Sequence, residues 1–237
     1  MHLTDIKFYS VAVPAPHFGG RYWTFVKLTT NDGIEGIGEI YSLPFHPDVV
    51  EQMTLDVFER NVKGRSPTDI EKMWRDIYST GYTQRPDTSI VGILSGIETA
   101  CWDIVGKSEN RPVYDLLGGK TRERLRSYTY LYPKPEDKTN VYADPDLAAE
   151  RAAEYVAQGF TAVKFDPTGA YTAFDGRFLS LETMDRAEEF CRKIREAVGN
   201  KADLLFGTHG QMTPAGAIRL AKRLEKFEPL WLEEPTP

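Results

Sequence analysis

Strand-like and helix-like segments alternate in the second half of the chain, and this alternation restricts the possible folds more than any other feature. The strand-like segments are 127–132, 160–166, 202–209 and 230–234, and the helical segments between them are 146–159, 181–199 and 213–227. Strands that alternate with helices at this spacing form βα units and a parallel sheet. A closed (β/α)8 barrel needs eight of each over about 250 residues. We therefore expect the first half of a (β/α) TIM-like barrel.

Terminal signals support these helices. Gly159 follows the first helical segment, where a glycine cap is common. Thr213 precedes the third as a plausible N-cap, with Pro214 at its first position.

The first part of the chain has a different order of elements. Apolar and polar residues alternate in 6–13, 22–30 and 34–41, with Asn31-Asp32-Gly33 as a turn, which predicts a three-stranded antiparallel meander. The periodicity from Pro47 to Lys107 then becomes helical and predicts three helices. Strands followed by helices indicate an α+β domain. We place this domain at 1–122 and the partial barrel at 123–237.

Composition and local patterns exclude several classes of protein. The formal net charge is -6 and Lys and Arg do not cluster, so a nucleic-acid partner is not expected. The N-terminal residues lack the pattern of a signal peptide, and no apolar stretch approaches membrane-spanning length, so we expect a cytoplasmic protein without a membrane partner. Cys101 and Cys191 are far apart in helical settings and are expected to be buried structural thiols.

Polar side chains gather where the predicted parallel strands end. Ligands bind at the carboxyl ends of such strands. The second strand ends at Lys164 and Asp166, the third at Gly207, His209 and Gln211, and the fourth at Glu233 and Glu234. Alternation along a strand puts Lys164 and Asp166 on one face, and Gly207, His209 and Gln211 on one face. Taken singly, each charged residue is more often solvated or ion-paired, but their combination suits acid–base chemistry with a metal.

These motifs resemble the mandelate racemase branch of the enolase superfamily. The resemblance rests on residues 100–107 (ACWDIVGK), 112–119 (PVYDLLGG), the Lys164 strand end and the closing Leu-Glu-Glu-Pro, and it covers the whole chain. It implies an α+β capping domain over a modified barrel, an enolase-type fold. It also implies that Mg²⁺ binds a substrate carboxylate while a base removes the adjacent proton, and that the metal stabilises the enediolate.

The resemblance also implies roles for individual residues. Lys164 matches a lysine that contacts the substrate carboxylate, and Asp166 replaces a second lysine, either as a base or to orient Lys164. His209 matches a histidine that acts on the departing hydroxyl in galactonate and mannonate dehydratases. Glu233 matches a metal ligand. Gly207 occupies the usual position of the first metal carboxylate, so either His209 or Gln211 replaces that ligand, or metal binding is weaker, or the chemistry has shifted.

We therefore expect a magnesium-dependent lyase that removes water from a sugar acid. A cycloisomerase of an anhydro-sugar acid or lactone would share the first step, and a non-catalytic sugar-acid binder is an alternative that Gly207 permits. In the capping domain, Phe18, Phe45 and His46 would bind substrate, although simple surface loops explain them equally well. The resemblance further suggests a homo-oligomer.

Overall fold

The computed structural model describes residues 1–237 except 16, 18–19, 42–43, 83–86 and 170–178. The chain divides into two compact units, Met1–Glu123 and Arg124–Pro237. Each unit has its own cluster of buried apolar side chains.

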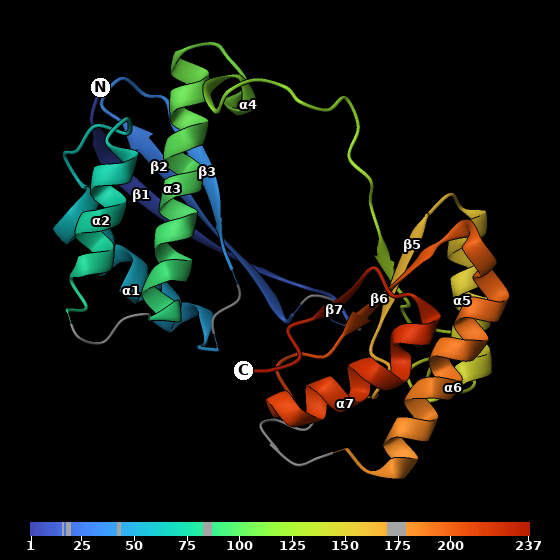
Figure 1. The fold of residues 1–237 in the computed structure, drawn as a ribbon. Helices are drawn as coiled ribbons and strands as arrows, with labels where there is room; N and C mark the ends of the chain where they lie inside the picture. The colour runs from blue at the N-terminus through green and yellow to red at the C-terminus, as the bar shows by residue number, and fades with distance from the viewer. Residues whose placement is uncertain (16, 18–19, 42–43, 83–86, 170–178) are drawn as a thin grey trace. The chain divides into compact units, whose positions relative to one another are not determined.

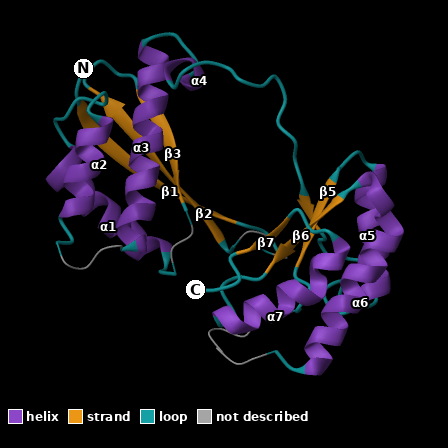
Figure 2. Ribbon diagram, viewed as in Figure 1, coloured by secondary structure: helices purple, strands orange, loops and turns teal. Residues whose placement is uncertain are grey.

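The first unit is a three-stranded antiparallel sheet covered by helices (Figures 1 and 2). The strands pair in the order β1-β2-β3, as the sequence predicts, and Gly33 has the positive φ of +80° that the turn before β3 requires. Its elements are β1 (Leu3–Ala12), β2 (Tyr22–Thr30), β3 (Glu35–Ile40), α1 (Pro47–Val57), α2 (Ile70–Ser79), α3 (Thr88–Ser108) and α4 (Val113–Leu116). The π-helix η1 (Phe58–Val62), which continues α1, and the short α4 were not predicted.

Helix α3 packs directly on β3 through small residues. The buried Gly36 and Gly38 of β3 face the backbone of α3, and a Cβ at Gly38 would lie 1.8 Å from the carbonyl oxygen of Gly96. The two backbones approach this closely only because neither glycine has a side chain.

The length and apolar character of α3 correct one prediction. This 21-residue helix is long and apolar enough to cross a membrane by length and composition alone, so the prediction that no apolar stretch approaches that length was wrong. Its buried side chains, among them Ile93, Ile97 and Ile104, belong to the core of the first unit. Burial in a protein core explains the same composition.

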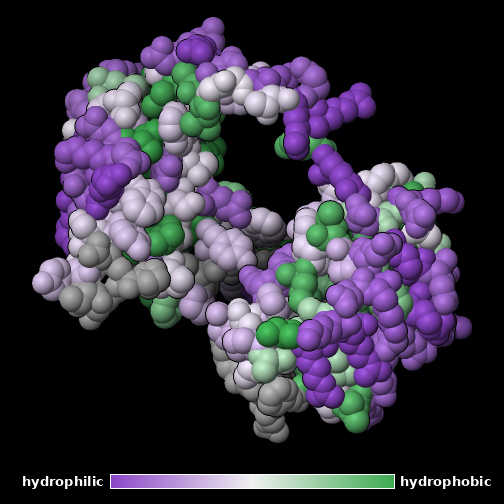
Figure 3. All heavy atoms as spheres, viewed as in Figure 1, coloured by the Kyte–Doolittle hydropathy of each residue, from purple (hydrophilic) through white to green (hydrophobic). Residues whose placement is uncertain are grey.

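The second unit contains a four-stranded parallel sheet in the order β4-β5-β6-β7. This is the sequential order expected for half of a (β/α) barrel. The elements of the second unit are β4 (Thr129–Tyr130), α5 (Pro145–Ala157), β5 (Ala162–Phe165), α6 (Leu181–Val198), η2 (Gly199–Lys201), β6 (Asp203–Gly207), α7 (Pro214–Leu224), η3 (Glu225–Phe227) and β7 (Trp231–Glu233). On the face drawn in Figure 3, hydrophilic residues dominate the surface over α5 and α6.

Alternation along the strands separates a core face from the face that carries Lys164. Val163 and Phe165 of β5, with Leu204 and Phe206 of β6, belong to the core that also contains side chains of α5 and α6. The rings of Phe165 and Phe206 meet edge to face, with centroids 5.4 Å apart. Lys164, between these core residues, points to the opposite face.

The strand after residue 202 is shorter than predicted. β6 ends at Gly207, and His209 has a φ of +53°, which is incompatible with an extended strand. The prediction that Gly207, His209 and Gln211 share one strand face was therefore wrong. The chain turns instead because the Gly210 and Met212 backbone N–H groups donate to the carbonyls of Glu234 and Pro235.

Candidate active site

A partly buried ion pair connects two strands of the parallel sheet. Lys164, which is 6% exposed, donates from Nζ to Oε1 of Glu233 at 2.5 Å. Lys164 lies opposite Leu205 and Glu233 lies opposite Gly207, so the lysine side chain reaches across β6. No side chain at Gly207 blocks this path. The pair places a cation and a carboxylate at the carboxyl end of the sheet.

Aromatic rings surround the Lys164 ammonium group. Its Nζ lies 5.2 Å from the ring centroid of Tyr130 and 5.8 Å from that of Tyr128. Ring faces attract a cation, more strongly when it is shielded from water. The two rings and Glu233 thus surround the end of a lysine side chain that is almost completely buried.

Asp166 is held by two other elements. The Tyr130 hydroxyl at the end of β4 donates to its Oδ1 at 2.6 Å, and His209 Nδ1 lies 3.7 Å from its Oδ2. Burial raises the pKa of the Asp166 carboxyl above its usual value, while the Tyr130 hydrogen bond and the charges of His209 and Lys164 oppose that rise. Burial and the same hydrogen bond also raise the pKa of the Tyr130 hydroxyl, which therefore remains a proton donor.

The loop after β6 is attached to the end of β7. Thr208 is fully buried, and its hydroxyl donates to the Glu233 carbonyl at 2.6 Å. This bond and the Gly210 backbone bond to Glu234 hold His209 and Glu233 on neighbouring strand ends. The structure thus brings together Lys164, Asp166, His209 and Glu233, which come from three strand ends.

The described residues do not complete a metal site. No group of three His, Cys, Asp or Glu side chains that can hold a metal ion occurs among them. Gly207 offers no ligand, and Glu233 is already paired with Lys164. Gln211 Nε2 is buried without a hydrogen-bond partner among the described residues. That nitrogen is a donor, which suits a hydroxyl or carboxylate oxygen rather than a cation.

Two of the predicted substrate-binding residues line a pocket within the first unit, and the third, Phe18, lies outside the described residues. Phe45 and His46 line a pocket of about 340 Å³ together with Arg21, Tyr22 and Thr24. His46 also has a structural role, because its Nδ1 accepts from the Asp48 backbone N–H at 3.4 Å and caps α1.

The two cysteines are buried, as predicted. Burial raises the pKa of the Cys101 thiol to about 12 and that of Cys191 further. Neither thiol is reactive in this state.

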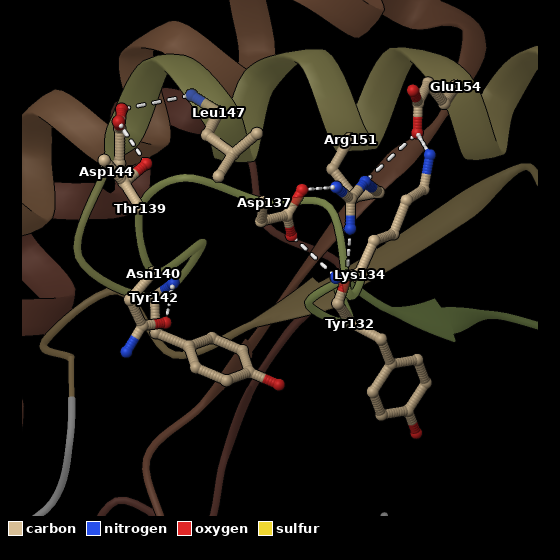
Figure 4. Close-up of polar contacts among 10 residues, drawn as sticks. All are labelled: Tyr132, Lys134, Asp137, Thr139, Asn140, Tyr142, Asp144, Leu147, Arg151 and Glu154. Atoms are coloured by element: carbon tan, nitrogen blue, oxygen red, sulfur yellow. Dashed lines mark hydrogen bonds and ion pairs between the residues drawn. The ribbon is translucent and has the colours of Figure 1, made fainter. Parts of the chain in front are cut away.

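A second polar cluster joins the loop that follows β4 to helix α5 (Figure 4). Arg151 of α5 is 2% exposed, donates from Nη2 to Asp137 Oδ1 at 2.7 Å, and donates from Nη1 to the Tyr132 carbonyl. Its Nε lies 3.0 Å from Glu154 Oε2, which also accepts from Lys134 Nζ at 2.6 Å. Arg151 therefore fixes the loop after β4 to α5.

Breaking this cluster is expected to destabilise the second unit. Replacing Arg151 with methionine would remove the guanidinium from the Asp137 carboxylate, which keeps only its hydrogen bond from the Lys134 backbone N–H, and we expect a lower free energy of unfolding. Chemical denaturation measures this loss. Adding Asp137→Asn to the same variant should restore part of it, and a single variant as stable as the wild type would contradict the assignment.

The same pair should make stability depend on pH. The Lys134 backbone N–H, and then the Arg151 guanidinium, hold the pKa of Asp137 below its usual value of 3.8. Because the folded-state pKa is depressed, the stabilisation is complete above pH 3.8 and is lost as the pH falls through the lower, folded value. We expect Asp137→Asn to lack this part of the acid-dependent loss in denaturation curves.

Sequence reasoning missed Tyr130 and Arg151. Alternation within residues 127–132 puts Tyr128, Tyr130 and Tyr132 on one face of a strand. The alternating tyrosines were the signal that the sequence offered, and the pairing of Tyr130 with Lys164 became known only from the structure. Arg151 sits in an amphipathic helix, where an arginine is ordinarily exposed, and nothing in the pattern marked it as buried.

Family models match both units of the chain. The model of the mandelate racemase/muconate lactonizing enzyme N-terminal domain matches residues 17–118. The model described as enolase C-terminal domain-like matches residues 147–237. The two matches follow each other in the order of the two compact units.

Individual relatives agree with these models. The chain is 32% identical over 224 residues to a D-xylonate dehydratase of Haloferax volcanii, covering 92% of this chain and 52% of the relative. It is 33% identical over 215 residues to a D-gluconate/D-galactonate dehydratase of Picrophilus torridus, covering 89% and 51%. A crystal structure of a candidate mandelate racemase/muconate lactonizing enzyme from Burkholderia SAR-1 is 62% identical, with a TM-score of 0.95, and the match covers 100% of this chain and 59% of that one. The chain spans about half the length of these two curated relatives.

Proposed function

The chain belongs to the mandelate racemase/muconate lactonizing enzyme branch of the enolase superfamily, and we propose that it forms part of an acid-sugar dehydratase. The observation that carries the proposal is the meeting of Lys164, Asp166, His209 and Glu233 at adjacent strand ends. The dehydratases of D-xylonate, D-gluconate and D-galactonate among its relatives indicate the substrate class, a polyhydroxylated carboxylic acid.

Dehydration of such an acid needs three things from the protein. A cation must offset the negative charge that grows on the substrate carboxylate, a base must take the proton next to it, and an acid must protonate the departing hydroxyl. Lys164 provides the cation, and its buried position strengthens the attraction because little water screens it.

Asp166 and His209 are suited to the proton transfers. His209 has its side chain 34% exposed, and its Nδ1 faces Asp166, so a carboxylate orients the ring. We assign to His209 the protonation of the departing hydroxyl. We assign to Asp166 the removal of the proton next to the substrate carboxylate, and its Oδ2 also orients the His209 ring.

Magnesium dependence is part of the proposal. Glu233 is the residue of this chain that would contribute a carboxylate to the ion, which would offset charge on the substrate carboxylate. The roles given above to Lys164, Asp166 and His209 are roles of side chains of this chain. The homo-oligomeric state and the cytoplasmic location stay predictions.

A screen of sugar acids by mass spectrometry tests the function. The full-length protein, with and without magnesium, is incubated with D-xylonate, D-gluconate, D-galactonate and related acids. We expect magnesium-dependent loss of one water from at least one of them. The Lys164→Met variant, carried through the same screen, should form far less of this product.

The other outcomes assign other functions. A product of unchanged mass but new retention time would replace the dehydratase with a cycloisomerase. No product and no bound metal, in a protein that is folded, would indicate a sugar-acid binder.

A further inference from the structure

The backbone conformation at position 207 does not require a glycine. Gly207 lies in β6 in an extended conformation, and its φ is not among the positive values found elsewhere in the chain. Glycine inside a strand is unfavourable, because it loses more conformational freedom on folding than any other residue. A glycine at such a position often indicates that another group approaches closely.

The approaching groups are Asp166 and Tyr130. A Cβ at position 207 would lie 2.4 Å from Asp166 Oδ1 and 2.6 Å from the Tyr130 hydroxyl oxygen, the two atoms that share the 2.6 Å hydrogen bond. It would also lie 3.3 Å from Cε of Lys164. Any side chain at this position would therefore displace the hydrogen-bonded pair.

We propose that Tyr130, Asp166 and Gly207 form one interlocked unit, in which Tyr130 is a positioning residue that holds the Asp166 carboxylate in the space a residue-207 side chain would fill. The catalytic consequence rests on the proposed function, because it assumes that Asp166 acts on the substrate or through His209. The Asp166 carboxylate, which follows β5, therefore occupies the space beside residue 207, and the Tyr130 hydroxyl of β4 fixes its position.

The interlocked unit also explains how the two oxygens of the Asp166 carboxylate divide their contacts. Asp166 Oδ1 faces Tyr130 while Oδ2 faces His209, so the tyrosine fixes the rotation of the carboxylate that His209 meets. Without the hydroxyl, the carboxylate can rotate about its side-chain bonds, and the histidine loses a defined partner. Tyr130 acts only through Asp166 in this arrangement.

A double-mutant cycle between positions 130 and 207 tests the proposal. We expect Gly207→Ala to lower the melting temperature of the intact protein, and to lower it much less in a Tyr130→Phe background, because the phenylalanine removes the oxygen 2.6 Å from the new Cβ. Asp166→Ala is a second relief variant, since it removes the atom at 2.4 Å. Gly216→Ala is the matched control, because its Cβ would meet nothing closer than 3.4 Å.

Steady-state kinetics of Tyr130→Phe distinguish a role in positioning Asp166 from a purely structural role. Tyr130→Phe should lower kcat about 10- to 100-fold, the range for a hydrogen bond to a charged group, and change KM little. The melting arm needs no substrate, so it reports on the interlock even if the sugar-acid screen finds no reaction. Additive losses at positions 130 and 207, or a Gly207→Ala variant as stable as Gly216→Ala, would overturn the interlock. An unchanged kcat in Tyr130→Phe of an active enzyme would overturn the positioning role.

Discussion

Replacing Lys164 with methionine is expected to lower kcat/KM by about 10²- to 10⁴-fold, the range for a group that assists proton transfer or offsets charge in the transition state. The loss should appear mainly in kcat, because the developing charge is greatest in the transition state. Steady-state kinetics on the sugar acid identified by the screen measures it.

Loss of folding must be separated from loss of chemistry in this variant. Removing the ammonium leaves Glu233 without its partner at 2.5 Å. The double variant Lys164→Met, Glu233→Gln removes both charges and should recover stability without recovering activity. Lys164→Arg keeps the charge but changes its shape and reach, and we expect little rescue. Activity within tenfold of the wild type in the methionine variant would eliminate Lys164 from the mechanism.

Replacing Gly38 with alanine is expected to lower the free energy of unfolding of the first unit by about 3 kcal/mol or more. A Cβ there would lie 1.8 Å from the Gly96 carbonyl oxygen and 2.9 Å from the Ala100 backbone nitrogen. Both atoms belong to the backbone of α3, so no rotamer change removes the clash, and the helix must move away from the sheet. Overpacking of this kind costs about 1–3 kcal/mol and occasionally more.

Chemical denaturation with a control in the same strand tests this. Glu39 is adjacent to Gly38, but its side chain is exposed. Glu39→Ala should change the free energy of unfolding by no more than about 0.5 kcal/mol. A Gly38→Ala variant as stable as this control would mean that β3 and α3 are not packed through these glycines.

The sequence was sufficient for the order of elements because the relevant signals are local. Strand and helix periods, the Thr213 N-cap and the glycine after α5 act over a few residues, and the structure has the corresponding elements. The same local signals did not reveal where β6 stops. Its end depends on backbone bonds from Gly210 and Met212 to the chain after β7, and that chain is distant in sequence.

The sequence by itself determined that the candidate residues lie at or just after the ends of successive parallel strands, because the strand and helix periods that order these elements are local. Only the tertiary structure determined which of these residues contact one another. Lys164 finds Glu233 across an intervening strand, Asp166 is held by Tyr130, and Gly207 leaves the space that both contacts use. Such contacts join segments tens of residues apart, and their geometry depends on how the strands pair, which no local pattern encodes.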